Sequence, residues 1–183
     1  MATSLNLRQY QEAILARLDS ALQDGAVRQQ SFLGVIVGCE RVLVDMSQVS
    51  EALPKPSIYP APNTQHWFLG TANVRGNLYA INDLAGFFGY ADVDANLKKS
   101  DARILLLQEK VASHTAIFVD RLIGLRSSEN LKKVVGTKKH DSQQFAHECF
   151  FDDEYEDEDG SHWRVLDCQA LVNLKGFMQA GLV

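Results

Sequence analysis

From Ser31 onward, the chain consists of short apolar runs separated by glycines, prolines and polar turns. Runs rich in Val, Leu and Ile that lack a helical stripe are typical of strands. The pattern predicts strands at about 31–38, 41–46, 68–74, 78–82, 102–108, 116–125 and 162–167. Because no long helix alternates with these strands, the chain is predicted to be mainly β, with small barrels rather than a parallel α/β sheet.

The segments between these strands are predicted from their turn and breaker residues. Ser47 is expected to begin a short turn that holds Val49 and Leu53. Residues 54–64 contain all four prolines and form a connector, because proline lacks an amide hydrogen and disfavours helix in the residue before it. Residues 91–100 are polar and mark a candidate subdomain boundary.

The second half of the chain is more polar. Asp120 and Arg121 are expected where the chain leaves the core, before a basic loop with a weak strand over 126–147. Residues 148–151 form a possible strand. The acidic run that follows is predicted to be a solvated, mobile loop, and residues 168–178 a short helix.

Residues 5–23 have the clearest helical pattern in the chain. Apolar side chains recur there at spacings of three and four, which places them on one helix face. The pattern favours a helix that docks on the body of the protein, and a partner-binding helix is the alternative. The apolar positions are Leu7, Tyr10, Ile14, Leu18 and Leu22.

The stretch from Trp67 to Gly89 has the clearest turn and cap signals in the chain. Two strands flank a turn at 75–77, where Gly76 supplies the positive φ of a two-residue hairpin and Asn77 tolerates it. Asp83 is placed to cap a helix over 84–88, accepting from the amide three residues on. An exposed arginine at the turn suits partner recognition, although a solvated turn is the alternative.

Composition and charge narrow the class of protein. The 183 residues allow one compact domain or two small subdomains, and no apolar run approaches the roughly 18 residues of a membrane helix. The first 20 residues carry scattered charges, which predicts no secretion signal. The net charge of −5 argues against nucleic-acid binding, and much of it comes from the acidic run 152–159. The three cysteines form no C-x-x-C pair, which fits a reduced, cytoplasmic setting.

Candidate chemistry is sparse. His140, His147 and Cys149 lack the close spacing of zinc ligands, and the acidic run lacks the glycine and alternating ligands of a calcium loop. Cys39 and Cys168 stand in apolar contexts that favour an inert core thiol. No local motif marks a nucleophile or a phosphate-binding loop. The sequence therefore predicts a non-enzyme without metal or cofactor, and a metal- or ligand-binding sensor is the alternative.

The hairpin stretch closely resembles the signature of the CheW-like chemotaxis coupling proteins, in which G-x-x-N-x-R-G precedes a strand and a D-L-x-x-x-F/L-G helix. The matching positions are Gly70, Asn73, Arg75, Gly76, Asp83, Leu84, Phe88 and Gly89. Further segments agree in order: residues 43–53 with Val49 and Glu51, the connector with Pro60 and Pro62, residues 116–125 with Val119 and Asp120, and residues 164–174. The resemblance covers about residues 32–175.

The resemblance implies two packed five-stranded SH3-like barrels, at about 31–90 and 101–168 within a domain 31–178, after a helical extension 1–30. It implies a non-catalytic adaptor between the cytoplasmic tip of a methyl-accepting chemoreceptor and the regulatory domain of a histidine kinase. Such an adaptor is cytoplasmic and is recruited to the inner membrane through receptor–kinase arrays. The implied receptor-binding residues are Val49, Glu51, Asn73, Arg75 and Gly76. The implied kinase-binding residues are Val119, Asp120, Leu122 and Leu125.

Three departures from the family pattern point to a subtype. Tyr79-Ala80 replaces the usual Pro-Val, and both the N-terminal helix and the acidic insertion are additional. These features are more similar to the adaptors of type IV pilus (twitching motility) systems than to flagellar coupling proteins, which remain the alternative. The extra helix suits a subtype-specific partner contact.

Overall fold

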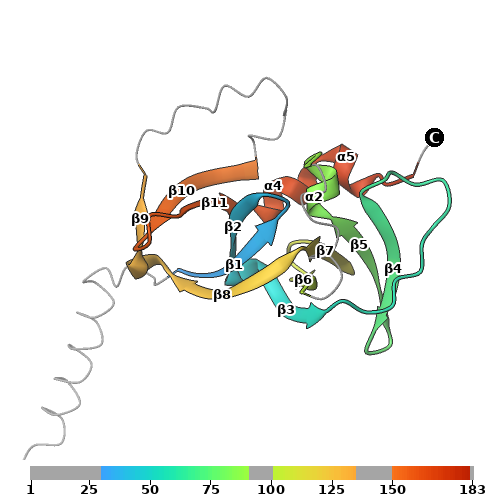
Figure 1. Cartoon of the computed structure of the whole chain (residues 1–183). Helices are drawn as coiled ribbons and strands as arrows, with labels where there is room; N and C mark the ends of the chain where they lie inside the picture. Colours follow the sequence, from blue (N-terminus) through green and yellow to red (C-terminus); the bar gives the residue numbers. More distant parts are fainter. Residues whose placement is uncertain (1–29, 91–100, 135–149, 182–183) are drawn as a thin grey trace, which may run out of the picture.

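The computed structural model describes residues 30–90, 101–134 and 150–181 (Figure 1). The helix predicted over 5–23 lies outside the described residues, as do His140, His147 and Cys149. The strands are β1 (Ser31–Val37), β2 (Glu40–Asp45), β3 (Val49–Pro54), β4 (Phe68–Val74), β5 (Asn77–Asp83), β6 (Arg103–Leu107), β7 (Thr115–Val119), β8 (Arg121–Ser127), β9 (Leu131–Lys133), β10 (Phe151–Asp157) and β11 (His162–Leu166). The helices are η1 (Met46–Gln48), α2 (Leu84–Phe87), η2 (Ser128–Asn130), α4 (Cys168–Asn173) and α5 (Lys175–Met178).

The strands form two sheets, which confirms the mainly β fold class. Sheet A has six strands in the order β8-β1-β2-β11-β10-β9, and sheet B has five in the order β3-β6-β7-β5-β4. Most neighbours are antiparallel, but β11 runs parallel to β2 and β7 runs parallel to β5. Since β6 and β7 join sheet B, the chain changes sheets between β7 and β8 and not at residues 91–100.

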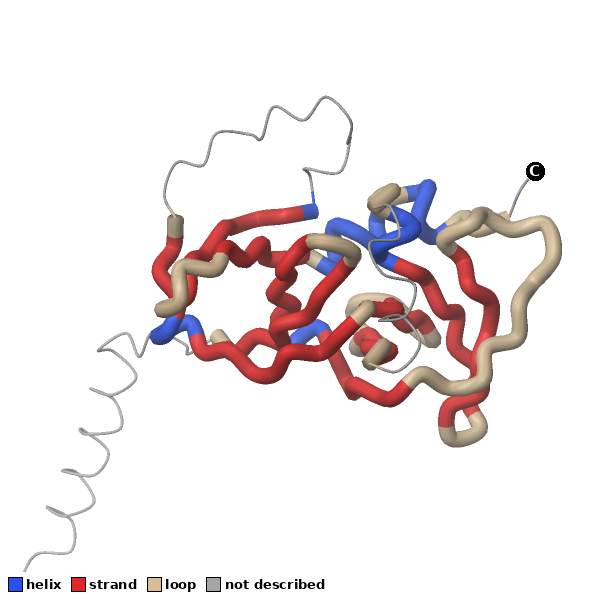
Figure 2. The backbone as a smooth tube through the Cα atoms, viewed as in Figure 1, coloured by secondary structure: helices blue, strands red, loops and turns tan. Residues whose placement is uncertain are grey.

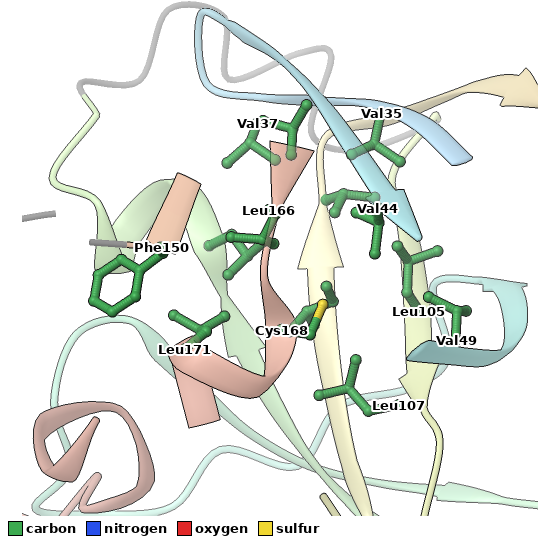
Figure 3. Close-up of a cluster of buried hydrophobic side chains, with 14 of the residues drawn as sticks. Val35, Val37, Val44, Val49, Leu105, Leu107, Phe150, Leu166, Cys168 and Leu171 are labelled. Carbon is green, nitrogen blue, oxygen red and sulfur yellow. The ribbon is translucent and has the colours of Figure 1, made fainter. Parts of the chain in front are cut away.

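A hydrophobic core lies between the two sheets (Figure 3). Sheet A supplies Val35 and Val44, and sheet B supplies Leu105 and Val119, all with at most 1% of their surface exposed. Helix α4 closes this core with Leu171. The side chains labelled in Figure 3 come from both sheets, from this helix and from Phe150, just before β10. The shared core therefore holds the two sheets in a fixed relation.

Each sheet also has a core of its own on its other face. In sheet B, Ile104 and Phe118 alternate along their strands with residues of the shared core. In sheet A, Phe32 and Leu43 pack with Trp163. Strands buried on both faces need continuous apolar runs, which explains why the sequence shows such runs rather than strict alternation.

Residues 49–54 and the acidic run differ from the sequence predictions. Residues 49–54, expected to be part of a turn, form strand β3, whose register with β6 shifts between Val49 and Glu51. The acidic run, expected to be a solvated loop, is mostly strand β10, paired with both β9 and β11. Its acids are partly matched by basic neighbours: Lys133 Nζ lies 2.7 Å from Asp153 Oδ1.

Helices α2, α4 and α5 lie together on one side of the molecule, whereas η1 and η2 lie apart from them (Figure 2). Asp83 caps α2, as predicted, but its side chain accepts from the amide of Ala85, two residues on, at 3.1 Å. The predicted helix over 168–178 is two helices, α4 and α5, with Phe177 of α5 stacked on Trp67 at 5.7 Å between ring centroids. This packing anchors the start of the hairpin stretch.

Candidate functional site

The hairpin at Arg75 is a tight two-residue connection. Val74 of β4 pairs with Asn77 of β5, so Arg75 and Gly76 alone form the turn. Both have positive φ, 53° at Arg75 and 89° at Gly76, which is the pattern of a type I′ turn. The predicted positive φ at Gly76 is confirmed, but the second such residue is Arg75 and not Asn77. An arginine in this conformation is strained, since its Cβ disfavours left-handed backbone.

Asn73 holds the turn in shape. Its side-chain Oδ1 accepts a hydrogen bond from the Gly76 amide at 2.9 Å. The side chain thus satisfies a backbone donor that no strand partner reaches at the tip. This contact assigns Asn73 a positioning role beside the exposed Arg75.

Gly70 allows the proline-rich connector to cross β4. Tyr59 and Thr71 exchange two backbone hydrogen bonds, Tyr59 N to Thr71 O at 2.7 Å and Thr71 N to Tyr59 O at 2.9 Å. Gly70 has φ of 122°, and a Cβ there would stand 2.1 Å from Tyr59 O. Only glycine permits this approach, so the connector fixes the base of the hairpin.

Arg75 pairs with Glu51 of β3. Arg75 Nη2 lies 2.6 Å from Glu51 Oε1, with 73% of the arginine side chain and 32% of the glutamate side chain exposed. Strands β3 and β4 are the two edges of sheet B, so this ion pair links its opposite ends. The guanidinium keeps most of its surface, and hence most of its donors, available to a partner.

The bulge in β3 decides which residues share this surface. Val49 is buried in the shared core, with 8% exposure. Residues two apart on a regular strand face the same side, but the register shift between Val49 and Glu51 places an extra residue between them. Glu51 therefore reaches Arg75, whereas Val49 packs into the shared core beneath the strand. The structure brings Glu51, Asn73, Arg75 and Gly76 together, with Val49 as a core residue.

The residues that the resemblance implies for kinase binding differ in how far they are buried. Val119 and Asp120 are buried, Leu122 is half-buried, and Leu125 is 64% exposed on β8. The sequence prediction that the chain leaves the core at Asp120 is wrong. The Asp120 amide donates to Ile36 O at 3.0 Å, and its Oδ2 accepts from Gly38 N at 2.6 Å. Asp120 thus fixes the crossing from sheet B to sheet A, and only Leu122 and Leu125 offer surface.

Sequence reasoning missed Ile123 beside this group. Ile123 is 41% exposed and has no partner residue in the β1–β8 register, where the pairing shifts. The glycine that follows it, Gly124, has φ of 142°. A glycine inside a strand pattern often marks a bulge, so Gly124 was the signal that could have found it.

The thiols and possible metal ligands give no reactive centre within the described residues. Cys39 is exposed in the β1–β2 turn, which corrects the expectation of a core thiol, whereas Cys168 is buried as expected. Burial raises the pKa of the Cys168 thiol to about 12. In the described ranges, no group of three or more His, Cys, Asp or Glu side chains is placed to hold a metal ion. None of the helices there has the length and apolar character that crossing a membrane requires.

Two sheets around a shared core, with an exposed charged turn at one sheet edge, define a two-sheet β domain. The chain belongs to the CheW-like domain family, which residues 31–175 match. This family consists of non-catalytic coupling scaffolds. Protein PilI of Pseudomonas aeruginosa is 27% identical over 166 residues, covering 87% of this chain and 85% of PilI. The crystal structure of the scaffolding protein TtCheW from Thermoanaerobacter tengcongensis has a similar fold, with a TM-score of 0.62 and 18% identity over 81% of this chain and 95% of that one.

Proposed function

We propose that this protein is the adaptor of a type IV pilus chemosensory system, coupling a methyl-accepting chemoreceptor to a histidine kinase. The observation that supports it most directly is the exposed Arg75, held in a strained turn by Asn73 and paired with Glu51. Strained backbone tends to persist at functional sites, because a less costly residue would otherwise serve. The similarity to PilI along most of both chains supports the pilus system over a flagellar one.

The receptor surface is proposed at the Arg75 turn. Glu51 and Arg75 present both charge signs at adjacent points, and Asn73 is exposed beside them. A helical receptor tip with polar side chains could pair with both charges at once. Arginine is a frequent anchor at such interfaces, because its planar head group makes several hydrogen bonds.

The kinase surface is proposed on β8, at Leu122 and Leu125. Apolar side chains exposed on an edge strand suit a protein partner, because burying them removes apolar surface from water. Val119 and Asp120 would act there only indirectly, by holding the strand. This surface lies in sheet A and the receptor surface in sheet B, so both partners could bind at the same time.

Binding of the purified chain to a receptor cytoplasmic fragment and to the kinase regulatory domain tests both surfaces. Arg75→Glu should weaken receptor binding at least tenfold and leave kinase binding unchanged. Leu125→Asp should do the reverse, so each variant is the control for the other. Arg41→Glu, a charge reversal at an exposed site in sheet A, should change receptor binding little. Undiminished receptor binding by Arg75→Glu would refute the proposed receptor surface. Co-purification of the protein from its native cells tests the pilus assignment, and recovery of a flagellar receptor would refute it.

A further inference from the structure

The bulge in β3 sets the direction in which Glu51 points. Val49 pairs with Leu107 of β6. The next pair joins Glu51 to Leu106, so Ser50 is the extra residue between them. Leu107 belongs to the shared core, whereas Leu106 belongs to the separate core of sheet B. Because paired residues on neighbouring strands point to the same face of a sheet, the bulge turns Glu51 to the face opposite Val49.

The packing of β3 requires one extra residue but does not decide which residue it is. Val49 lies in the shared core, and Ala52, three positions later, packs against the same core. Residues that face one side of a regular strand are separated by an even number of positions, so this odd spacing needs an extra residue. Either Ser50 or Glu51 could take that position. With Ser50 there, Glu51 faces the turn and reaches Arg75.

The hydroxyl of Ser50 favours Ser50 as the extra residue. Ser50 Oγ donates a hydrogen bond to Leu106 O at 3.1 Å, across the bulge. A bulge leaves its extra residue unpaired in the strand ladder, so this side chain supplies a contact that the ladder lacks. A carboxylate at the same place could not donate to the carbonyl. Glu51 is therefore a poor substitute for Ser50 in the extra position.

Gln108 holds the residues just before the bulge. Its backbone amide donates to Gln48 O at 2.9 Å, and its side-chain Nε2 donates to Val49 O at 3.1 Å. A carbonyl oxygen only accepts, which fixes the orientation of the Gln108 side-chain amide. Gln108 is itself anchored, because its carbonyl accepts from the amides of Val111 and Ala112, which are both buried. Gln108 therefore holds two consecutive carbonyls of the chain from a fixed point.

From these contacts we propose that Ser50 and Gln108 are positioning residues for the receptor surface, because they place the β3 bulge so that Glu51 meets Arg75. They act through Glu51. The effect on receptor binding rests on the proposed function, whereas the placement of Glu51 can be measured without any partner. With Glu51 held there, a receptor must offer a donor to the carboxylate as well as an acceptor to the guanidinium.

Carboxyl ¹³C NMR of the purified full-length chain tests the placement of Glu51. In the wild-type chain, the Glu51 Cδ resonance, assigned by its loss in Glu51→Gln, should shift when Arg75 is changed to alanine. Gln108→Met keeps the length of the side chain but removes its donor, and Ser50→Ala removes the hydroxyl. In either background, Arg75→Ala should lose most of its effect on the Glu51 resonance. Ser50→Thr, which keeps a hydroxyl, should retain the full shift.

Thr115→Val is the matched control for these variants. It also removes a hydroxyl of sheet B that donates to a carbonyl, Ser113 O at 3.1 Å, but away from the bulge. In this background, Arg75→Ala should shift the Glu51 resonance as it does in the wild-type chain. A full shift in both Gln108→Met and Ser50→Ala would overturn the proposal. An equal loss in Thr115→Val would also overturn it, because any missing donor in the sheet would then have the same effect.

Binding to a receptor cytoplasmic fragment tests the consequence for recognition. Gln108→Met should weaken receptor binding about fivefold and leave kinase binding unchanged. Glu51→Gln alone should also weaken receptor binding, but it should cause no further loss when added to Gln108→Met. Losses that add would overturn the positioning role, because independent sites are additive. If the NMR result is as expected but Glu51→Gln leaves receptor binding unchanged, the placement of Glu51 is supported and the proposed receptor surface is refuted.

Discussion

The Arg75 guanidinium joins the two edge strands of sheet B, with its Nη2 2.6 Å from Glu51 Oε1. The two residues are 24 positions apart, and three strands lie between β3 and β4 in the sheet. The pair therefore exists only because the sheet curls until its edges approach. Because the pair also lies at the proposed receptor surface, this one contact would both join the sheet edges and take part in recognition.

The stability contribution of this pair should be small. Because both side chains keep solvent contact, Arg75→Ala is expected to cost no more than about 1 kcal/mol of unfolding free energy. A double-mutant cycle with Glu51→Ala, measured by urea unfolding, should give a coupling energy of about 0.5 kcal/mol that falls with added salt. A coupling above about 2 kcal/mol would mean that the pair holds the sheet closed, and receptor-binding losses could then reflect unfolding.

Replacing Arg75 with asparagine should separate stability from binding. Asparagine tolerates the left-handed backbone that Arg75 adopts at φ of 53°. Arg75→Asn is therefore expected to gain about 0.5–1 kcal/mol, or about 1–4 °C in Tm, while losing the guanidinium. Calorimetry and receptor binding of the same sample check this. Lower Tm in the variant would show that the turn is not strained by arginine.

Gly70 and Gly76 should differ sharply when changed to alanine. At Gly70 the new Cβ would stand 2.1 Å from Tyr59 O, so the connector must move, at an expected cost of about 3 kcal/mol or more. At Gly76 nothing lies within 4 Å, and the cost is the positive φ alone, about 1 kcal/mol. Urea midpoints of the two variants give the comparison. Similar losses at both sites would contradict the crossing of the connector over β4.

The two described cysteines should react at very different rates. In a Cys149→Ser variant, Cys39 should react with a thiol reagent at pH 8 in a fast phase, because it is exposed. With its pKa raised to about 12, Cys168 has only about 10⁻⁴ of its thiol ionised at that pH and is shielded by burial. It should react only in denaturant. Cys39→Ser is the control, and it should leave no fast phase.

Asp157 should make the β10–β11 hairpin sensitive to acid. The hydrogen bond from Trp163 Nε1 to Asp157 Oδ2, 2.8 Å long, holds the pKa of this carboxyl below its usual 3.8. A pKa lower in the folded than in the unfolded state adds stability above about pH 4 and loses it as pH falls through the folded value. Asp157→Asn should cost about 1 kcal/mol near neutral pH, and the difference should shrink below pH 4. Tryptophan fluorescence during unfolding, to which both Trp67 and Trp163 contribute, follows this. A difference that persists unchanged at pH 3 would rule out the linkage.

Much of sheet B could be predicted from sequence, since its apolar runs and the hairpin around Gly76 are local signals. The strand β10 could not, because acids disfavour strands locally and its stabilisation is non-local. Tyr155 is buried with Trp163, and Lys133 pairs with Asp153. Tertiary contacts of this kind override β propensity.

The residues of the candidate site were inferred from family resemblance, which does not predict their geometry. Family resemblance named Glu51 and Arg75 together, yet neither spacing nor propensity shows that they touch. No glycine in the sequence indicates the β3 bulge between Val49 and Glu51. Asp120 was misplaced for a related reason: its partners, Gly38 N and Ile36 O, lie more than 80 positions away.

The order of strands in sheet A has a consequence for synthesis. Strands β3 to β7 form sheet B from one continuous stretch, whereas sheet A combines β1 and β2 with β8 to β11. As the chain leaves the ribosome, sheet B can complete its pairing first, while β2 waits for β11, about 120 residues later, to cover its open side. Until then the apolar residues of β1 and β2 are only partly buried. A nascent chain would most need a chaperone during this interval.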